Sequence, residues 1–219
     1  MIKFPPYSFW NHFKSANGAM SCAEAIFMYN ACLCVPEDGI RVEMGTYKSK
    51  SALVSLMAWV DEKLATLYLL EPEFSDVSFL NEAQSNIIKF KSKYNGNTIC
   101  HFKPQYSTEF LTENDGYSYI MWDSGDHGED LVQAEKKLLE SKVISGGIVI
   151  MHDLFSQFTA CTRAYEQLVA TGDYEPIVFD WLPIFDYVKE NNLEEGNNSW
   201  HLYPELSHPP NFIGALRRK

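Results

Sequence analysis

The sequence predicts an α/β fold in which a single, mostly parallel sheet is doubly wound and carries helices on both faces. Strand-like apolar runs alternate with helix-periodic segments through most of the 219 residues. Two of these runs, 119–122 and 148–151, stop at carboxylates, Asp123 and Asp153, and one helical segment separates them. This strand–helix–strand unit requires parallel pairing, which places both acids at one edge of the sheet. Ligands of open parallel sheets bind at that edge.

The expected elements follow from hydrophobic periodicity and from turn residues. Helices are expected at 18–33, 52–63, 78–94, 106–113, from about 129 onward, and at 159–170. Strands are expected at 40–42, 66–70, 98–102, 119–122, 148–151, 177–179 and 212–216, which makes the sheet seven-stranded. Ser49 or Ser51 is a candidate N-cap of the helix at 52–63, and Ser78 is the candidate for the helix at 78–94.

Three further segments are predicted to lack regular structure. The pair Gly146–Gly147 is interpreted as a turn before a strand. Residues 185–199, which are polar and rich in Asn, are predicted to form a loop with a helical turn. The last residues, Arg217–Lys219, are expected to be a solvated basic tail.

The chain is expected to form one domain, residues 18–219, preceded by an arm at 1–17. No internal repeat, low-complexity linker or break in composition divides it. The arm is aromatic and contains Pro5 and Pro6. We expect it to pack on its own domain or on a partner subunit, so a homo-oligomer formed through the arm is one possibility.

Composition narrows the classes of partner. The formal net charge of −11 argues against nucleic acid and against an anionic membrane surface, because both need a basic face. The longest apolar stretches are shorter than the roughly 20 residues of a membrane-spanning helix. The opening MIKFPPYSFWNHF lacks the apolar centre of an export signal, and the five cysteines have no metal-type spacing. These features predict a cytoplasmic protein with free thiols.

Two strand ends carry residues that suit a nucleotide-like ligand. Gly45 follows the first strand, where a glycine lets a ligand approach the backbone at a helix N-terminus. Glu71 ends the second strand, where an acid can accept hydrogen bonds from both hydroxyls of a ribose. Taken alone, Gly45 is more typical of a plain turn and Glu71 of a solvated acid, whereas the pair favours a ligand site and the plain interpretation about equally.

The densest cluster of ionisable side chains consists of Asp123, Asp126, His127, His152 and Asp153. Such a cluster could bind one divalent cation, with oxygen ligands favouring Mg²⁺, Ca²⁺ or Mn²⁺. It could instead supply a general base, for which the histidines are suited by their ordinary pKa. Asp126 could equally turn the loop or cap the following helix.

The residues at these strand ends resemble the motifs of a known family. Glu43-x-Gly45-Thr46-Tyr47 with Ser51 is similar to the first motif of class I S-adenosylmethionine-dependent methyltransferases, and Glu71 matches their acid after the second strand. Asp123 with His127, followed by residues 146–153 (GGIVIMHD), resembles the subgroup of macrocin-type O-methyltransferases and cephalosporin-hydroxylase-like proteins. The resemblance covers about residues 18–170.

The resemblance implies a Rossmann-like methyltransferase sheet, S-adenosylmethionine as cofactor and Mg²⁺ as a second cofactor to be tested. The cofactor-binding residues it implies are Glu43, Gly45, Thr46, Tyr47, Ser51, Glu71 and Asp123. It implies His127, His152 and Asp153 as catalytic residues, and Asp123, Asp153 and His152 as metal ligands. Glu43 and Gly45 would lie under the methionine part and Glu71 would hold the ribose.

The chain also departs from the family pattern. Relatives commonly have glycine at the positions of Ser49 and often Lys50, and the segment from Asp123 to His127 is one residue longer, so Asp123 or Asp126 could be the equivalent acid. Leu154 follows Asp153 where metal-dependent relatives have Asn or Asp.

The function expected from the resemblance is methylation of a small molecule, most simply at a hydroxyl oxygen, with the acceptor held by residues 1–17 and 181–211. The alternatives are an inactive methyltransferase-fold interaction module and a cephalosporin-hydroxylase-like enzyme. A nicotinamide dehydrogenase is disfavoured because the GxGxxG motif is absent.

Overall fold

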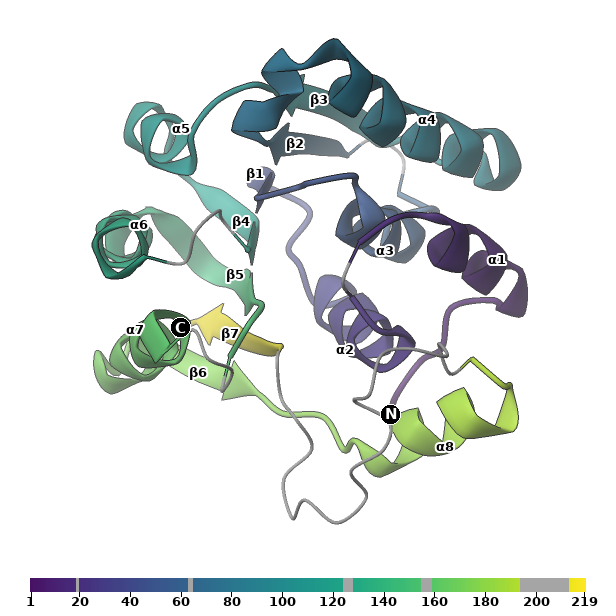
Figure 1. Cartoon of the computed structure of the whole chain (residues 1–219). Coiled ribbons are helices and arrows are strands. Elements are labelled where there is room, and N and C mark those ends of the chain that lie inside the picture. The colour runs from purple at the N-terminus through teal and green to yellow at the C-terminus, as the bar shows by residue number, and fades with distance from the viewer. Residues whose placement is uncertain (19, 63–64, 124–127, 155–158, 194–212) are drawn as a thin grey trace.

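The computed structural model contains a seven-stranded sheet with the strand order β3-β2-β1-β4-β5-β7-β6. It describes residues 1–18, 20–62, 65–123, 128–154, 159–193 and 213–219. Figure 1 shows the order from β3 at the top to β6 at the bottom. All pairs from β3 to β5 are parallel, whereas β7 lies antiparallel between β5 and β6. The predicted doubly wound α/β sheet is therefore confirmed.

The strands are β1 (Ile40–Met44), β2 (Thr66–Leu70), β3 (Ile99–Lys103), β4 (Tyr117–Trp122), β5 (Val143–Met151), β6 (Tyr174–Ile177) and β7 (Gly214–Arg218). The helices are α1 (Tyr7–Ser15), α2 (Cys22–Cys32), α3 (Lys50–Ala58), α4 (Val77–Tyr94), α5 (Ser107–Glu113), α6 (Glu129–Lys142), α7 (Thr159–Ala170) and α8 (Leu182–Glu190), with a short 3₁₀ helix η1 at Pro72–Ser75.

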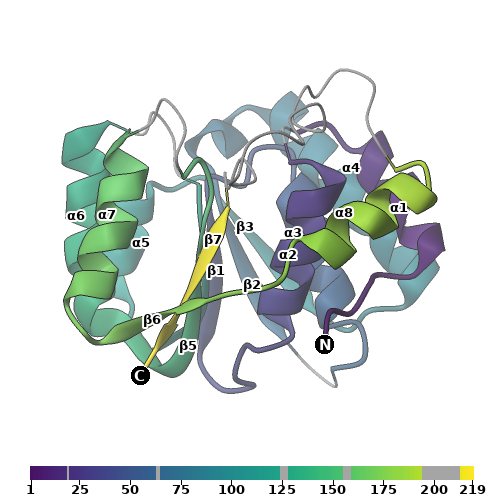
Figure 2. The ribbon, with the colours of Figure 1, turned by 90° about the horizontal axis from the view of Figure 1, so that it is seen from below.

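Helices cover both faces of the sheet (Figure 2). On one face lie α1, α2, α3, α4 and α8, and on the other lie α5, α6 and α7. Side chains alternate between the faces along a strand, so neighbouring residues of β4 enter different cores. Tyr119 and Met121 join the core under α2 and α3, while Ile120 and Trp122 join the core under α6 and α7.

The N-terminal segment is helical and packs on its own domain. Phe9, Trp10 and Phe13 of α1 are fully or almost fully buried, and Trp10 and Phe13 meet edge to face at 5.8 Å between ring centroids. Burial of three such side chains contributes several kcal/mol in area terms, at about 2 kcal/mol each. The large apolar side chains of α1 are thus used within the chain, apart from Tyr7, which is exposed.

One predicted N-cap is wrong, and another has the right position but makes no capping hydrogen bond. The helix α4 is capped by Asp76, whose carboxylate accepts hydrogen bonds from the amides of Ser78 and Phe79. Asp76 precedes the residue chosen from the sequence, and its carboxylate outcompetes a hydroxyl as an acceptor. Ser49 occupies the N-cap position of α3 but lies in the left-handed region (φ 69°), from which its side chain makes no capping hydrogen bond.

Two segments expected to be irregular belong, wholly or in part, to regular elements. Gly146 and Gly147 lie inside β5, where the register against β4 shifts at an irregularity. Gly146 has a positive φ of 77°, and at Gly147 the surrounding atoms leave no room for a side chain. Residues 182–190 form α8, whose Ile184 and Val188 are buried. Of the predicted loop, residues 194–199 lie outside the described residues.

The end of the chain is a strand instead of a solvated tail. Residues 217 and 218 belong to β7, and the Arg218 guanidinium lies over the ring of Tyr174 and pairs with Asp173 at 3.2 Å. The sixth strand begins at Tyr174, three residues before its expected start, because these residues pair with the antiparallel β7.

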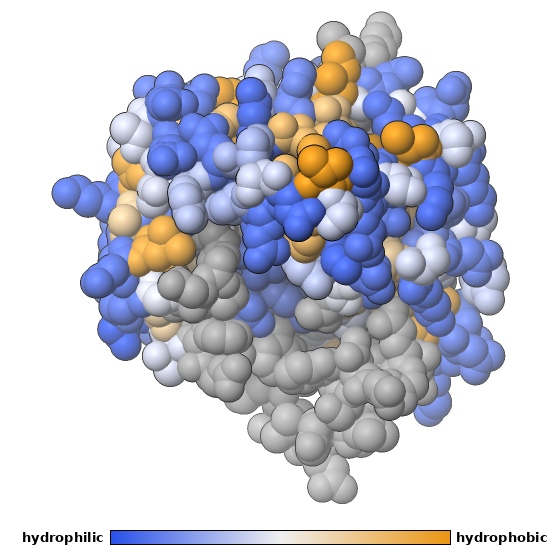
Figure 3. All heavy atoms as spheres, turned by 45° about the horizontal axis from the view of Figure 1, so that its top comes forward, coloured by the Kyte–Doolittle hydropathy of each residue, from blue (hydrophilic) through white to orange (hydrophobic). Residues whose placement is uncertain are grey.

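The face of the molecule shown in Figure 3 is mainly polar where it is described. In the view of Figure 3 hydrophilic residues predominate, and hydrophobic ones form small separate groups among them. None of the helices within the described ranges has the length and apolar character needed to cross a membrane.

A test of the fold uses the glycine pair of β5. A Cβ at Gly147 would lie 2.9 Å from the carbonyl oxygens of Ile144 and Tyr117, so Gly147→Ala is expected to lower the free energy of unfolding by about 1–3 kcal/mol. The matched control is Gly96→Ala, where the nearest atom is a Val60 methyl at 3.9 Å. Chemical denaturation measures both variants, and equal stabilities would contradict the packing described here.

Candidate functional site

The site is built where β1, β2, β4 and β5 end, and the backbone ladder continues past each of these ends. The amide of Asp123 donates to the carbonyl of Met44 at 3.0 Å, and the amide of His152 donates to the carbonyl of Trp122 at 3.1 Å. Parallel pairing thereby fixes the backbone of the strand-end residues relative to one another before any side chain is considered.

The turn between β1 and α3 is strained and tightly held. Gly45, Tyr47 and Ser49 all have positive φ angles, of 78°, 47° and 69°. Such a conformation suits glycine and costs about 1 kcal/mol or more for other residues. The amide of Tyr47 donates to a carboxylate oxygen of Glu71 at 3.0 Å, which ties the turn to the end of β2.

Beneath this turn lies Glu43, which is fully buried at the end of β1. One of its oxygens accepts a hydrogen bond of 2.6 Å from the hydroxyl of Ser51, whereas its Oε2 has no partner among the described residues. Burial raises the pKa of Glu43 to about 8, and the negative charge of Asp123 adds to the effect. Glu43 is therefore largely protonated at neutral pH.

Lys50 begins α3 and turns toward the N-terminal segment. Its ammonium donates to the carbonyl of Gly18 at 3.3 Å and lies 4.6 Å from the ring centroid of Phe13. A Cβ at Gly18 would meet the stem of Lys50 at 2.8 Å, so this glycine permits the close packing. Lys50 thus closes the side of the site next to α1.

A cavity of about 690 Å³ opens at this edge of the sheet. It lies between the segment that joins α1 to α2, the turn after β1, and the ends of β4 and β5. Its lining residues are Asn17, Gly18, Met20, Gly45, Thr46, Tyr47, Lys48, Lys50, Ser51, Asp123 and His152. A volume of this size is typical of small-molecule and cofactor sites.

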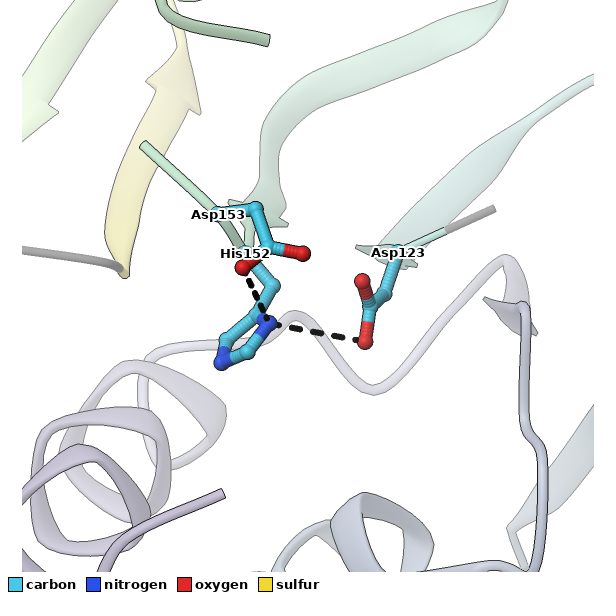
Figure 4. Close-up of side chains that lie close together, drawn as sticks. All are labelled: Asp123, His152 and Asp153. Carbon is cyan, nitrogen blue, oxygen red and sulfur yellow. Dashed lines mark ion pairs between the residues drawn. The ribbon is translucent and has the colours of Figure 1, made fainter. Parts of the chain in front are cut away.

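Asp123, His152 and Asp153 converge on one another (Figure 4), and the first two of them line the cavity. The Nδ1 of His152 lies 3.6 Å from an oxygen of Asp123 and 3.6 Å from an oxygen of Asp153. One donor atom from each residue can be chosen so that all three lie within 4.8 Å of one another. Asp153 has a φ of 57°, a conformation that Asp and Asn tolerate better than most residues and that turns its side chain back toward the imidazole.

A fourth ionisable side chain reaches the cluster from α2. The Nε2 of His152 lies 3.4 Å from Oε1 of Glu24, on the edge of the ring opposite the two aspartates. The other oxygen of Glu24 accepts a hydrogen bond of 2.8 Å from the amide of Ser21 in the capping box of the helix. Both oxygens of this buried carboxylate are thus turned to specific partners.

The electrostatics of the cluster favour a charged imidazole. Burial opposes the imidazolium, but the carboxylates of Asp123, Asp153 and Glu24 together raise the pKa of His152 well above its ordinary value. Burial likewise works to raise the pKa of Glu24, yet His152 and the backbone at Ser21 lower it overall. A raised pKa favours the protonated imidazole, and a histidine must be unprotonated to act as a general base.

The structure brings most of the sequence-predicted residues together. Gly45, Thr46, Tyr47, Ser51, Asp123 and His152 line the cavity. Glu43 lies under the turn, Glu71 beside it, and Asp153 against His152. His127 and the alternative acid Asp126 lie outside the described residues. The functional roles assigned to all of these residues remain predictions.

Sequence reasoning expected residues 1–17 to help form the site but singled out no residue there, and it missed the contribution of Met20 and Glu24. Asn17, Met20 and Glu24 reach the cavity or its cluster from the segment at 16–32. The pattern Ser21-x-x-Glu24 is a capping-box signal and could have marked the start of α2. It carries no information about the partner of the carboxylate, which is distant in the sequence.

Comparison with known proteins identifies the fold. The sequence matches neither a known family profile nor a curated protein. A methyltransferase homolog from Pyrococcus horikoshii superposes with a TM-score of 0.58 and 13% identity, over 91% of this chain and 66% of that one. The Podospora anserina methyltransferase PaMTH1, solved with S-adenosylhomocysteine, gives 0.56 and 13%, over 99% and 89%.

A third similar structure is CalS11, a TDP-rhamnose 3′-O-methyltransferase of calicheamicin biosynthesis. It superposes with a TM-score of 0.55 and 11% identity, over 88% of this chain and 76% of that one. At these identities the likeness establishes the fold, and this chain therefore has the Rossmann-like fold of the methyltransferases, as predicted.

A test of the buried Glu43 follows from its pKa of about 8, against an ordinary value of 4.5. Between these pH values the unfolded chain has lost a proton that the folded chain keeps, so the stability of the protein falls as the pH rises. Glu43→Gln removes this dependence. From pH 5 to pH 7.5 the free energy of unfolding of the variant should therefore rise relative to the wild type, by up to about 3 kcal/mol. Urea titrations at both pH values measure it, and parallel pH profiles would contradict a protonated Glu43.

Proposed function

We propose that this protein is an S-adenosylmethionine-dependent methyltransferase that acts on a small molecule at a hydroxyl oxygen. The observation that carries the proposal is the turn of Gly45–Tyr47, which lines the 690 Å³ cavity. Glu71 holds this turn through the amide of Tyr47. The methyltransferase fold and the similarity to CalS11 and to the S-adenosylhomocysteine-bound PaMTH1 support it.

The residues present fit S-adenosylmethionine. Gly45 has a positive φ and carries no Cβ, so a ligand can approach the backbone of the turn closely. Glu71 already accepts two backbone hydrogen bonds, one at each carboxylate oxygen, and keeps further lone pairs for ribose hydroxyls. Asp123 contributes a carboxylate to the wall of the cavity, where it suits a cationic sulfonium. When bound, the cofactor supplies an electrophilic methyl group.

Residues of the chain then hold the acceptor and manage its proton. The cavity aligns the acceptor oxygen, and alignment supplies a large part of the rate enhancement in reactions of this kind. The acceptor hydroxyl must lose a proton as its oxygen gains the methyl group. Asp123 and Asp153 can receive that proton, and the imidazolium of His152 can stabilise negative charge on the oxygen. His127 is the other base predicted from the sequence.

The metal predicted from the sequence is a separate part of this proposal. Asp123, His152 and Asp153 could hold a divalent cation, which would stabilise the deprotonated acceptor oxygen. Two carboxylates suit Mg²⁺, but an imidazole does not, since Mg²⁺ prefers oxygen ligands throughout.

The proposal also covers the partner and the compartment. The size of the cavity and the formal net charge of −11 favour a small acceptor over nucleic acid or a membrane surface. A cytoplasmic location and a homo-oligomer formed through residues 1–17 are retained as proposals. Of the side chains available to such an interface, Tyr7 is exposed.

Cofactor binding tests the first half of the proposal. Titration calorimetry with S-adenosylmethionine should detect one site, and Glu71→Gln should weaken binding about ten- to a hundredfold through the loss of charge-assisted hydrogen bonds. Glu73→Gln is the matched control, because Glu73 is an exposed acid two residues away, and it should leave the affinity unchanged. If the wild type fails to bind at millimolar cofactor, the protein is better described as an inactive interaction module.

Turnover tests the acceptor half. Formation of S-adenosylhomocysteine is measured with catechols, phenols and hydroxylated sugars as trial acceptors. Asp153→Asn keeps the shape of the side chain and suits the left-handed backbone at this position. It should lower turnover about a hundredfold and leave cofactor affinity within about threefold. Unchanged turnover would remove Asp153 from the catalytic machinery.

A further inference from the structure

The histidine of the cluster lacks the hydrogen bonds that a buried imidazole normally makes. His152 is 8% exposed, and neither of its ring nitrogens has a hydrogen-bond partner among the described residues. Buried polar atoms are almost always paired, and an exception calls for an explanation such as an ion at the site. The aspartates face Nδ1 at 3.6 Å, which is beyond the 2.7–3.2 Å range of good hydrogen bonds.

The same separations suit three ligands of one cation. Two ligand atoms that each lie about 2.1 Å from a tetrahedral metal ion are about 3.4 Å apart. The Nδ1 of His152 is 3.6 Å from each carboxylate oxygen, and the three donor atoms fall within 4.8 Å of one another. Small side-chain movements would bring all three into a single coordination sphere.

Glu24 occupies the place of an outer carboxylate in such a centre. Its Oε1 lies 3.4 Å from Nε2, so a proton on Nε2 leaves the lone pair of Nδ1 directed toward the two aspartates. Metal-bound histidines almost always give their second N–H to a carboxylate or carbonyl, which fixes the tautomer and the ring orientation. The capping box with Ser21 holds the other oxygen of Glu24, so the carboxylate is locked in place.

We propose that Glu24 is the positioning residue of a metal centre formed by Asp123, His152 and Asp153, and that this centre selects an imidazole-binding transition metal such as Zn²⁺ or Co²⁺ over Mg²⁺. The selection follows from the nitrogen ligand, since imidazole suits transition metals whereas Mg²⁺ takes oxygen. The inference deepens the proposed function, on which its role in methyl transfer rests, although metal binding itself requires neither cofactor nor acceptor.

The experiment uses the full chain after removal of metal by a chelator. Titration calorimetry with Zn²⁺ should give one site per chain, with Mg²⁺ binding at least about a hundredfold more weakly. Co²⁺ should give a visible absorption spectrum of nitrogen and oxygen coordination. His152→Gln should abolish both signals. Three results would each overturn the proposal: Zn²⁺ binding that survives His152→Gln, equal affinities for Mg²⁺ and Zn²⁺, or no stoichiometric binding of metal at millimolar concentration. The last result would favour an imidazolium held by carboxylates alone.

The variant Glu24→Gln isolates the outer carboxylate. It should weaken Zn²⁺ binding about ten- to a hundredfold and change the Co²⁺ spectrum. Ser21→Ala is the matched control, because it removes the capping hydroxyl while Glu24 still faces His152. It should lower thermal stability but leave Zn²⁺ affinity within about threefold. Equal Zn²⁺ affinities for the wild type and Glu24→Gln would overturn the role of Glu24. The S-adenosylmethionine titrations do not depend on the metal titrations, so failure of metal binding can be distinguished from failure of the proposed function.

Discussion

The parallel backbone ladder is the constraint on which this site depends. The amides of Gly45 and Thr46 both donate to the carbonyl of Leu70, at 3.0 and 3.1 Å, and similar bonds hold Asp123 and His152 just past the ends of β4 and β5. Because these bonds are part of the sheet, the strand-end residues inherit the rigidity of the core. Side chains placed on such elements need little further ordering when a ligand arrives.

Ionisable groups at the site are buried only where their charge is compensated or absent. Glu43 avoids the cost of burial by keeping its proton, whereas the surrounding carboxylates raise the pKa of His152 against the effect of burial. Lys50 places its ammonium over an aromatic ring and against a carbonyl. Such interdependence means that removal of one partner leaves another charge uncompensated, which is far more costly than removing an exposed pair.

The sequence allowed the sheet and the residues that gather at its edge to be predicted because both depend on local patterns. Apolar runs that stop at Asp123 and Asp153 encode strand ends directly, and Glu71 directly follows its strand. The positive φ of Ser49 could not be predicted, since packing around the turn overrides the preference of serine. Glu24 was missed because its contact with His152 joins distant parts of the chain, and a helix-start pattern does not specify a tertiary partner.

The position of β7 has a consequence for how the molecule folds. Among the described strands, β6 pairs with β7 alone, so it cannot join the sheet until Gly214–Arg218 has inserted beside β5. The pairing of β5 with β7 joins residues far apart in the sequence, such as Ile148 and Arg217. Closure of such contacts carries an entropic cost before it yields any stabilisation. We therefore infer that β6 is added to the sheet only after β7 has paired with β5.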